Sequence, residues 1–386
     1  MNQQASTHKK YQTRVLMIPD NRQDNPYQEL LANFLKAERL EVNFPQGYRR
    51  GLPIFRALKN QPKTIHILHL HWLNPYLKGK NWVIRLIYCF KFLLDLQLAH
   101  KKDCKIIWTV HNSLPHETQF PRIELWIRRR LAKLVDRIII HQACSVEEIS
   151  NLYQFDSKKV TVIPHGNYRQ TYQSSVSQLE ARNYLGLPLK GLIYLNLGLL
   201  RPYKGVDELL QVWEENQKSF QEDTLVIAGK AGKESYGILL QEKVSRLKGV
   251  ILHDHFIEDE LIHFYFSAAD FVICPFRKIL TSGSIILAMS YRRPIIAPNF
   301  PSIAETLGSA NWLLYNPEES QGLSNAIKKS REIDWEGLST LVNQECNRLN
   351  WDNIAQQTSQ LYLNLISQED NKDNSEVVAG VNETDR

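Results

Sequence analysis

The chain has 386 residues, of which 43% are hydrophobic and 23% are charged. These values are typical of a globular protein, and the length exceeds that of one ordinary domain, so two domains are expected. No run of eighteen uncharged apolar residues is found, which argues against a membrane-spanning helix, and the first residues lack the apolar core of a signal peptide. Five scattered cysteines without a C-x-x-C pair predict reduced thiols in a cytoplasmic protein without a cysteine metal site.

Charge is divided unevenly along the chain. Residues 1–170 contain 27 Lys and Arg against 13 Asp and Glu, a net charge of +14, whereas the remainder contains 20 against 28, a net charge of −8. A basic half of this kind indicates an anionic partner, either nucleic acid or an anionic membrane surface. An apolar-rich helix expected over 82–100 and a basic helix expected over 122–137 favour the membrane. Solvated charges on core helices explain the same pattern.

Strand-like apolar runs alternate with helical patterns in the first half. The runs that indicate strands cover residues 13–19, 64–72, 105–110, 136–141 and 160–168. A helix is expected after the first run, because Asp24 or Asn25 can cap it and Pro26 suits its first turn. This order predicts a doubly wound sheet, in which ligands bind beyond the carboxyl ends of the strands.

Histidines stand at the carboxyl ends of these runs. His69 and His71 point the same way on an extended strand, so a metal pair is one interpretation. No third ligand stands out, and strand-end histidines often only form hydrogen bonds. The third run leads into His111, which His116 and Glu117 follow. Any one of these three can be structural, but such a cluster at a sheet edge is typical of a functional site.

The second half opens with a polar stretch over residues 173–189, which predicts a linker between two domains. Further strand-like runs cover residues 191–198, 224–229, 249–253, 270–275 and 295–298. Helical patterns separate them, and two more cover 320–333 and 351–366. The polar residues after Ser367 predict a disordered tail.

A short turn, Thr281-Ser-Gly-Ser284, lies between a strand-like run and a helix expected over 285–290. The start of a helix presents backbone N–H groups and the positive end of the helix dipole, and this one adds hydroxyls. The turn therefore suits a phosphate or diphosphate. The alternative is an ordinary Ser/Thr cap with a glycine for turn geometry.

A cationic segment elsewhere in the second half is the expected partner of this turn. Arg201 and Lys204 lie in a turn that begins at Gly198 and ends at Gly205. Lys230 follows the strand-like run over 224–229. A guanidinium fork and a lysine point charge can together bind two phosphates.

Several short motifs occur in a characteristic order over residues 11–366. They are His111-Asn, Val162-Ile-Pro-His-Gly166, Gly198-x-x-Arg-Pro-x-Lys-Gly205, Ala228-Gly229, Ala269-Asp-x-x-x-x-Pro275 and the Ser-Gly-Ser turn followed by Arg293-Pro-Ile-Ile-Ala-Pro298. The ordered set resembles the GT-B glycosyltransferases of group 1, which are family 4-like and include bacterial polysaccharide and lipid-linked glycan enzymes.

This resemblance implies an α/β GT-B fold with two Rossmann-like doubly wound domains facing a cleft. The implied parts are a disordered tail at 1–10, an acceptor domain at 11–172, a linker at 173–189, a nucleotide-sugar domain at 190–348, a helix crossing back at 349–367 and a disordered tail at 368–386. The implied donor-binding residues are Gly198, Arg201, Lys204, Gly229, Lys230, Arg277, Thr281, Ser282, Gly283 and Ser284. Asn25, His71 and His165 are implied on the acceptor side, and His111, His116 and Glu117 are the candidates for catalysis.

One feature of the family is missing from this sequence. Many retaining members carry Glu-x7-Glu at the central helix, whereas Ile279 and Leu287 occupy the two positions here. Ribose recognition through the second glutamate is therefore lost. The Ser-Gly-Ser turn also resembles inverting GT-B enzymes, so both stereochemical outcomes stay open.

The resulting expectation is a hexosyltransferase that moves a sugar from GDP-mannose or a UDP-sugar to a lipid-linked or polysaccharide acceptor, without a metal ion or other cofactor. The expected location is the cytoplasm, with peripheral contact between the basic half and an anionic membrane. A dinucleotide-dependent oxidoreductase is a weaker alternative, because no G-x-G-x-x-G follows a strand. A nucleic-acid-binding protein is supported only by the basic half.

Overall fold

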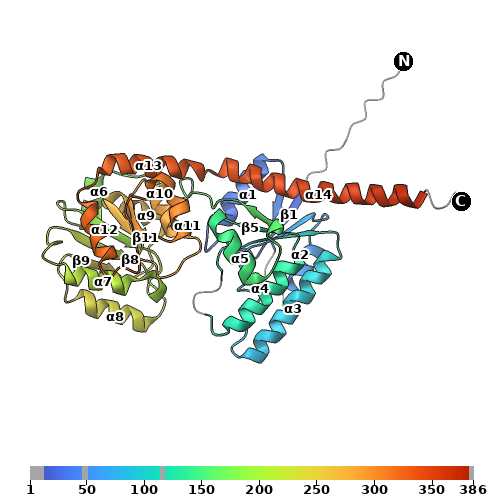
Figure 1. The fold of residues 1–386 in the computed structure, drawn as a ribbon, viewed down its shortest axis with the longest axis horizontal. Coiled ribbons are helices and arrows are strands. Elements are labelled where there is room, and N and C mark those ends of the chain that lie inside the picture. The colour runs from blue at the N-terminus through green and yellow to red at the C-terminus, as the bar shows by residue number, and fades with distance from the viewer. Residues whose placement is uncertain (1–12, 46–50, 114–117, 382–386) are drawn as a thin grey trace, which may run out of the picture. The chain divides into compact units, whose positions relative to one another are not determined.

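The structure, a computed structural model, describes residues 13–45, 51–113 and 118–381, with side chains as far as Ser367 (Figure 1). The chain forms two compact units, each built on a six-stranded parallel sheet. Unit 1 comprises the chain up to His141, Val146–Ile163 and the chain from Trp351 on, and unit 2 comprises Gln142–Ser145 and Pro164–Asn350. The expected two-domain α/β class is confirmed.

Unit 1 has the strand order β2-β1-β3-β4-β5-β6. Its strands are β1 (Arg14–Ile18), β2 (Glu41–Asn43), β3 (Ile67–Leu70), β4 (Lys105–Thr109), β5 (Arg137–Ile140) and β6 (Val160–Val162). Its helices are α1 (Tyr27–Ala37), α2 (Pro53–Lys59), α3 (Trp82–His100), α4 (Pro121–Leu134), α5 (Val146–Tyr153) and α14 (Trp351–Val381). The central strands are buried because helices cover a parallel sheet on both faces.

Unit 2 has the strand order β12-β11-β10-β7-β8-β9. Its strands are β7 (Ile193–Leu197), β8 (Thr224–Ala228), β9 (Val250–His253), β10 (Phe271–Ile273), β11 (Ile295–Pro298) and β12 (Leu314–Tyr315). Its α-helices are α6 (Gln178–Tyr184), α7 (Val206–Glu215), α8 (Glu234–Val244), α9 (Asp259–Ala268), α10 (Gly283–Ser290), α11 (Pro301–Leu307), α12 (Gly322–Ser330) and α13 (Trp335–Arg348). The short edge strands β2 and β12 were not predicted.

The division between the units differs from the linker expected at 173–189. Besides the short segment Gln142–Ser145, the chain passes from unit 1 to unit 2 after Ile163 and returns to unit 1 at Trp351. Polar residues of the expected linker instead fix helix α6 inside unit 2. Arg182 forms an ion pair with Asp270 at 2.8 Å, and Gln178 donates to the other carboxylate oxygen of Asp270 at 2.9 Å.

Helix α14 corrects the expectation of a disordered tail at 368–386. The helix runs from Trp351 to Val381. Packing of its first turns offsets the cost of nucleation, and each further residue then adds one backbone hydrogen bond. It belongs to unit 1, where it packs along α1. The tail expected at 1–10 lies outside the described residues. Among the residues that the structure describes, each helix is too short or too polar to cross a membrane.

A buried hydrogen bond ties α14 to the sheet of unit 1. The hydroxyl of Tyr362 lies 2.6 Å from Nδ1 of His69, whose Nε2 lies 2.7 Å from the hydroxyl of Thr109. Replacing Tyr362 with phenylalanine leaves His69 with an unmade buried hydrogen bond, so we expect the free energy of unfolding to fall by about 1–3 kcal/mol. Urea unfolding measures this. The control Tyr184→Phe alters a ring that is 60% exposed, and an equal loss in both variants would contradict the prediction.

Candidate functional site

Three neighbouring strands of unit 2 bring the predicted anion-binding residues together. Strand β7 pairs with β10 on one side and with β8 on the other. Because the three strands are parallel, the residues that follow them meet at one edge of the sheet. The segments 198–205, 229–230 and 281–284 all follow these strands, although 281–284 is separated from β10 by a loop.

Lys204 lies at the centre of this edge. Its Nζ atom is 3.5 Å from Oγ of Ser284, in the first turn of α10. Burial lowers the pKa of the Lys204 ammonium, and the charge of Arg201 lowers it further. Among the described residues no carboxylate forms an ion pair with Lys204, so an anion that entered here would meet a desolvated positive charge.

Two glycines make room for this arrangement. A Cβ atom on Gly198 would lie 2.8 Å from Nζ of Lys204, and one on Gly229 would lie 2.0 Å from the carbonyl oxygen of Gly198. Both residues have positive φ angles, +131° and +146°, which favour glycine. Lys230 follows Gly229 and is exposed at the same edge.

Replacing Gly198 with alanine tests this geometry. The added methyl group would displace the flexible end of Lys204 away from Ser284, so we expect the affinity for a nucleoside diphosphate to fall at least about tenfold. Gly186→Ala is the matched control, because Gly186 also has a positive φ of +64° but its Cβ would have no neighbour within 4 Å. Calorimetric titration of both variants measures the affinity, and equal affinities would contradict the prediction.

The turn before α10 combines a helix cap with the site. Helix α10 begins at Gly283, two residues earlier than expected, and Oγ of Ser282 accepts from the N–H of Ile285 at 3.2 Å. The hydroxyl of Thr281 donates to Oε1 of Gln142 at 3.0 Å. The hydroxyls of Thr281 and Ser282 are therefore engaged within unit 2, and the side chain of Ser284 is the one beside Lys204.

Arg277 has partners of its own. Its guanidinium forms an ion pair with Asp207 at 2.7 Å and donates to the carbonyl oxygen of Pro202 at 3.0 Å. These contacts fix the segment around Lys204 to the loop after β10. Its assignment to donor binding remains a prediction.

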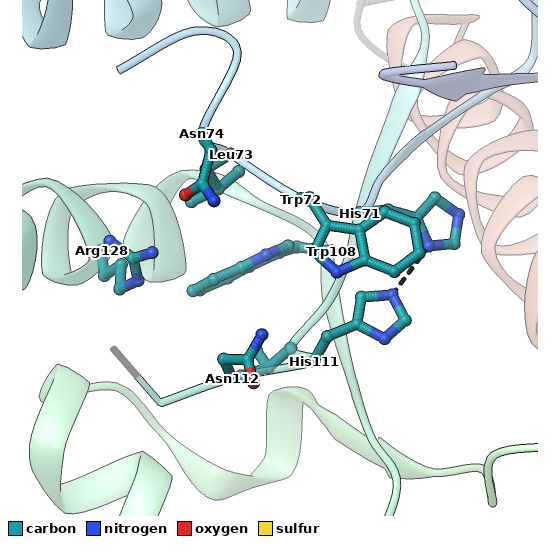
Figure 2. Close-up of a pocket in the computed structure, with 9 residues that line it drawn as sticks. His71, Trp72, Leu73, Asn74, Trp108, His111, Asn112 and Arg128 are labelled. Carbon is teal, nitrogen blue, oxygen red and sulfur yellow. Dashed lines mark hydrogen bonds between the residues drawn. The ribbon is translucent and has the colours of Figure 1, made fainter. Parts of the chain in front are cut away.

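A second group of polar residues lies in unit 1, where three adjacent strands end in histidines. His71 follows β3, His111 follows β4 and His141 follows β5. Nδ1 of His71 lies 3.2 Å from Nε2 of His111, and Nδ1 of His111 lies 3.3 Å from Nε2 of His141 (Figure 2 draws the first of these bonds). Nδ1 of His141 lies 2.9 Å from the carbonyl oxygen of Ile163.

The carbonyl of Ile163 fixes the direction of these hydrogen bonds when the rings are neutral. A carbonyl only accepts, so His141 donates from Nδ1 and accepts at Nε2 from Nδ1 of His111. His111 in turn accepts at Nε2 from His71. Both ring nitrogens of His111 are therefore held by other histidines.

Burial keeps the surrounding histidines neutral. It lowers the pKa of His69 to about 3 and that of His141 to about 4, and it lowers the pKa of His71 well below its usual value. The ring of Trp72 stacks on that of His111 with their centroids 4.2 Å apart. The ring of Tyr27 packs edge-on against His111 with a centroid distance of 4.9 Å. Aromatic rings thus pack against His111.

The remaining predicted residues are dispersed. Oδ1 of Asn25 accepts from the N–H of Tyr27 at 2.9 Å, as expected for a residue at a helix start. His165 lies beyond the short strand β6, in unit 2, where its Nδ1 is 2.8 Å from the carbonyl oxygen of Gly166. His116 and Glu117 lie outside the described residues. Within the described part of the chain, no group of three or more His, Cys, Asp and Glu side chains could hold a metal ion.

Sequence reasoning missed His141, Trp72 and Arg128 as parts of this region. A signal existed for His141, since it lies at the carboxyl end of a predicted strand, as His71 does. No local pattern marked Arg128, which lies on helix α4 and reaches the pocket beside His111 only in the folded unit.

The sequence matches two families of known proteins. Residues 192–331 match the family described as "Glycosyl transferases group 1", and residues 88–167 match "Glycosyltransferase Family 4". A similar protein is the GDP-mannose:glycolipid 4-beta-D-mannosyltransferase of Xanthomonas campestris pv. campestris, which is 25% identical over 309 residues. That match spans 78% of this chain and 81% of the relative.

Solved structures share the fold. The Anabaena protein Alr3699/HepE, in complex with UDP and glucose, aligns over 90% of this chain and 99% of its own, with a TM-score of 0.66 and 17% identity. A sucrose-phosphate synthase from Thermosynechococcus elongatus aligns over 93% of this chain and 100% of its own, with a TM-score of 0.67 and 18% identity.

Proposed function

Because the chain belongs to the group 1 glycosyltransferases and has their GT-B fold, we propose that it transfers a hexose from a nucleoside diphosphate sugar to a lipid-linked or polysaccharide acceptor. The enzyme is a hexosyltransferase. The observation that carries the donor assignment is Lys204, which has no carboxylate partner among the described residues and lies 3.5 Å from Ser284 at the start of α10.

Departure of a nucleoside diphosphate is the step that this edge of unit 2 supports. Breaking the bond between the sugar and the diphosphate leaves negative charge on the leaving phosphate. Lys204, Arg201 and the N-terminal end of α10 supply positive charge for it. These groups do the work for which other transferases use a metal ion, so transfer should persist in excess EDTA.

The donor is GDP-mannose or a UDP-sugar. GDP-mannose is named for the Xanthomonas relative, and UDP and glucose are bound in the Anabaena structure. A thermal-shift panel of GDP, UDP, NAD and a short oligonucleotide tests this. Stabilisation by one nucleoside diphosphate alone is the expected result. Stabilisation by NAD alone would favour an oxidoreductase, and by the oligonucleotide alone a nucleic-acid-binding protein.

Inversion at the anomeric carbon fits this chain better than retention. The glutamates of retaining members are replaced by Ile279 and Leu287, and the Xanthomonas relative is named for a beta linkage. Inversion needs a base for the acceptor hydroxyl. His111 can act as this base, or form a hydrogen bond with the sugar, only if it releases His71 or His141. We therefore favour His116 and Glu117 as candidates for the base. NMR of the product's anomeric proton measures the outcome.

An exposed face of helix α3 is proposed to hold unit 1 on an anionic membrane. Val83, Ile87, Phe90 and Leu94 are each between 45% and 59% exposed and share one helical stripe. Flanking lysines provide the charge that an anionic surface attracts, and they are Lys78, Lys80, Lys101 and Lys102.

The double variant Ile87→Glu/Phe90→Glu tests the membrane contact. The variant removes two apolar side chains that would insert into the lipid and adds two negative charges. We therefore expect binding to liposomes with anionic lipid to fall tenfold or more. Sedimentation measures it at low salt. The control Ile238→Glu changes a residue of unit 2 that is 52% exposed. Undiminished sedimentation of the double variant would remove the proposal.

A further inference from the structure

A small pocket in unit 1 has a cationic wall. It lies beside His71 and His111, with Trp72, Asn74, Asn112 and Arg128 around it (Figure 2). Its volume is about 40 Å³, and none of its described lining residues is a carboxylate. We call it the Arg128 pocket.

Arg128 is an unusual residue for such a position. Its side chain is buried, with only 5% of the residue exposed, and its Nε atom has no hydrogen-bond partner among the described residues. Its guanidinium forms an ion pair with Glu124, but Arg85 pairs with the same carboxylate. Two guanidiniums thus share one carboxylate, which leaves a positive charge at the pocket. A buried charge without full compensation is costly unless an anion joins it.

The pocket fits a small anion and not a whole sugar. A water molecule needs about 10–15 Å³ of such volume, so the pocket holds roughly three waters, or one phosphoryl or carboxylate group. Arg128 supplies charged donors, and the amides of Asn74 and Asn112 can donate beside it. A planar guanidinium with neutral amides around it is a typical site for an oxyanion.

We propose that the Arg128 pocket binds an anionic group of the sugar acceptor, either the phosphoryl group that joins a glycan to its lipid or the carboxylate of an acidic sugar. The inference rests on the proposed function, because it assigns to unit 1 the acceptor of that transfer.

The first test is kinetic and uses a soluble short-chain acceptor. Arg128→Met should raise the acceptor KM by about 10- to 100-fold while the donor KM changes little, because a charged hydrogen bond is lost. Arg128→Lys keeps the charge and should restore part of the affinity. Arg122→Met is the control, since Arg122 is an exposed arginine on the same helix. An unchanged acceptor KM in Arg128→Met, or equal losses in the methionine and lysine variants, would overturn the proposal.

Paired acceptors identify the source of the anion. A phosphoryl-linked acceptor is compared with the same glycan on a neutral alkyl group, and a uronic acid acceptor with its neutral hexose. If the wild type prefers the charged acceptor of one pair and Arg128→Met does not, the charged group of that pair is the one that the pocket binds. If neither pair shows a preference in the wild type, the proposal is wrong.

A binding measurement separates this proposal from the proposed function. With unit 2 saturated by the nucleoside diphosphate, inorganic phosphate should quench the tryptophan fluorescence of the wild type, because Trp72 and Trp108 line the pocket, but not that of Arg128→Met. If the wild type transfers sugar but phosphate quenches the wild type and Arg128→Met alike, the anion-binding role of the Arg128 pocket is wrong and the transferase assignment stands. A wild type that transfers no sugar but shows the difference would contradict the transferase assignment and leave the pocket as an anion site of another function.

Discussion

Replacing Lys204 with alanine is expected to lower kcat/KM for the nucleotide sugar by about 100-fold or more, which corresponds to about 3 kcal/mol of lost transition-state stabilisation. The ammonium lies beside Ser284. In the proposed reaction it would stabilise the negative charge of the departing diphosphate. Because the charge on the leaving phosphate grows during the reaction, most of the loss should be in kcat.

Lys328→Ala is the matched control for this variant. Lys328 is an exposed lysine on α12 of the same unit, so its removal changes the net charge equally without touching the site. Steady-state kinetics with the preferred donor and a thermal unfolding curve for each variant provide the measurement. Wild-type turnover in Lys204→Ala would show that the diphosphate binds elsewhere.

The second large effect is a loss of stability in mild acid. His69, His71 and His141 are neutral in the fold, with pKa values lowered by burial to about 3 for His69 and about 4 for His141, and well below 6.5 for His71. In the unfolded chain the same groups take up protons below pH about 6.5. The unfolded state therefore binds more protons between pH 6.5 and about 4, so stability falls as the pH is lowered through this range and is constant above it.

At pH 5 His69 and His141 each cost about 2 kcal/mol and His71 acts in the same direction, so the free energy of unfolding should fall by several kcal/mol relative to pH 7.5. Urea unfolding at the two pH values measures this. His69→Gln, which replaces the imidazole with a polar side chain that does not titrate, should reduce the pH slope by up to one proton. The control His100→Asn alters an exposed histidine and should leave it unchanged. Equal stabilities at pH 5 and pH 7.5 would contradict the histidine assignment.

The proposed phosphate-binding edge could be predicted in part, because its segments carry local signals. Gly198, Lys204 and the turn 281–284 are marked by glycine, charge and hydroxyl patterns after strand-like runs. Sequence order does not reveal that β7 lies between β8 and β10, yet that adjacency is what brings Lys204 to Ser284. The resemblance to a known family was what indicated that the segment around Lys204 and the turn 281–284 bind the same diphosphate.

The errors of prediction have physical reasons. A polar stretch was assigned to a linker, but Arg182 and Gln178 are polar because they bind Asp270 across unit 2. Composition predicted disorder beyond Ser367, where the backbone of α14 continues from its packed first turns. The bonds between His71, His111 and His141 depend on ring orientations that residue spacing does not specify.

The central claim is that Lys204 and the first turn of α10 hold one diphosphate. A crystal structure of the complex with the stabilising nucleoside diphosphate tests it most directly. We expect oxygens of the terminal phosphate within about 3 Å of Nζ of Lys204 and of Oγ or N–H groups in the segment 283–284. A diphosphate bound away from both, with Lys204 still beside Ser284, would contradict the account.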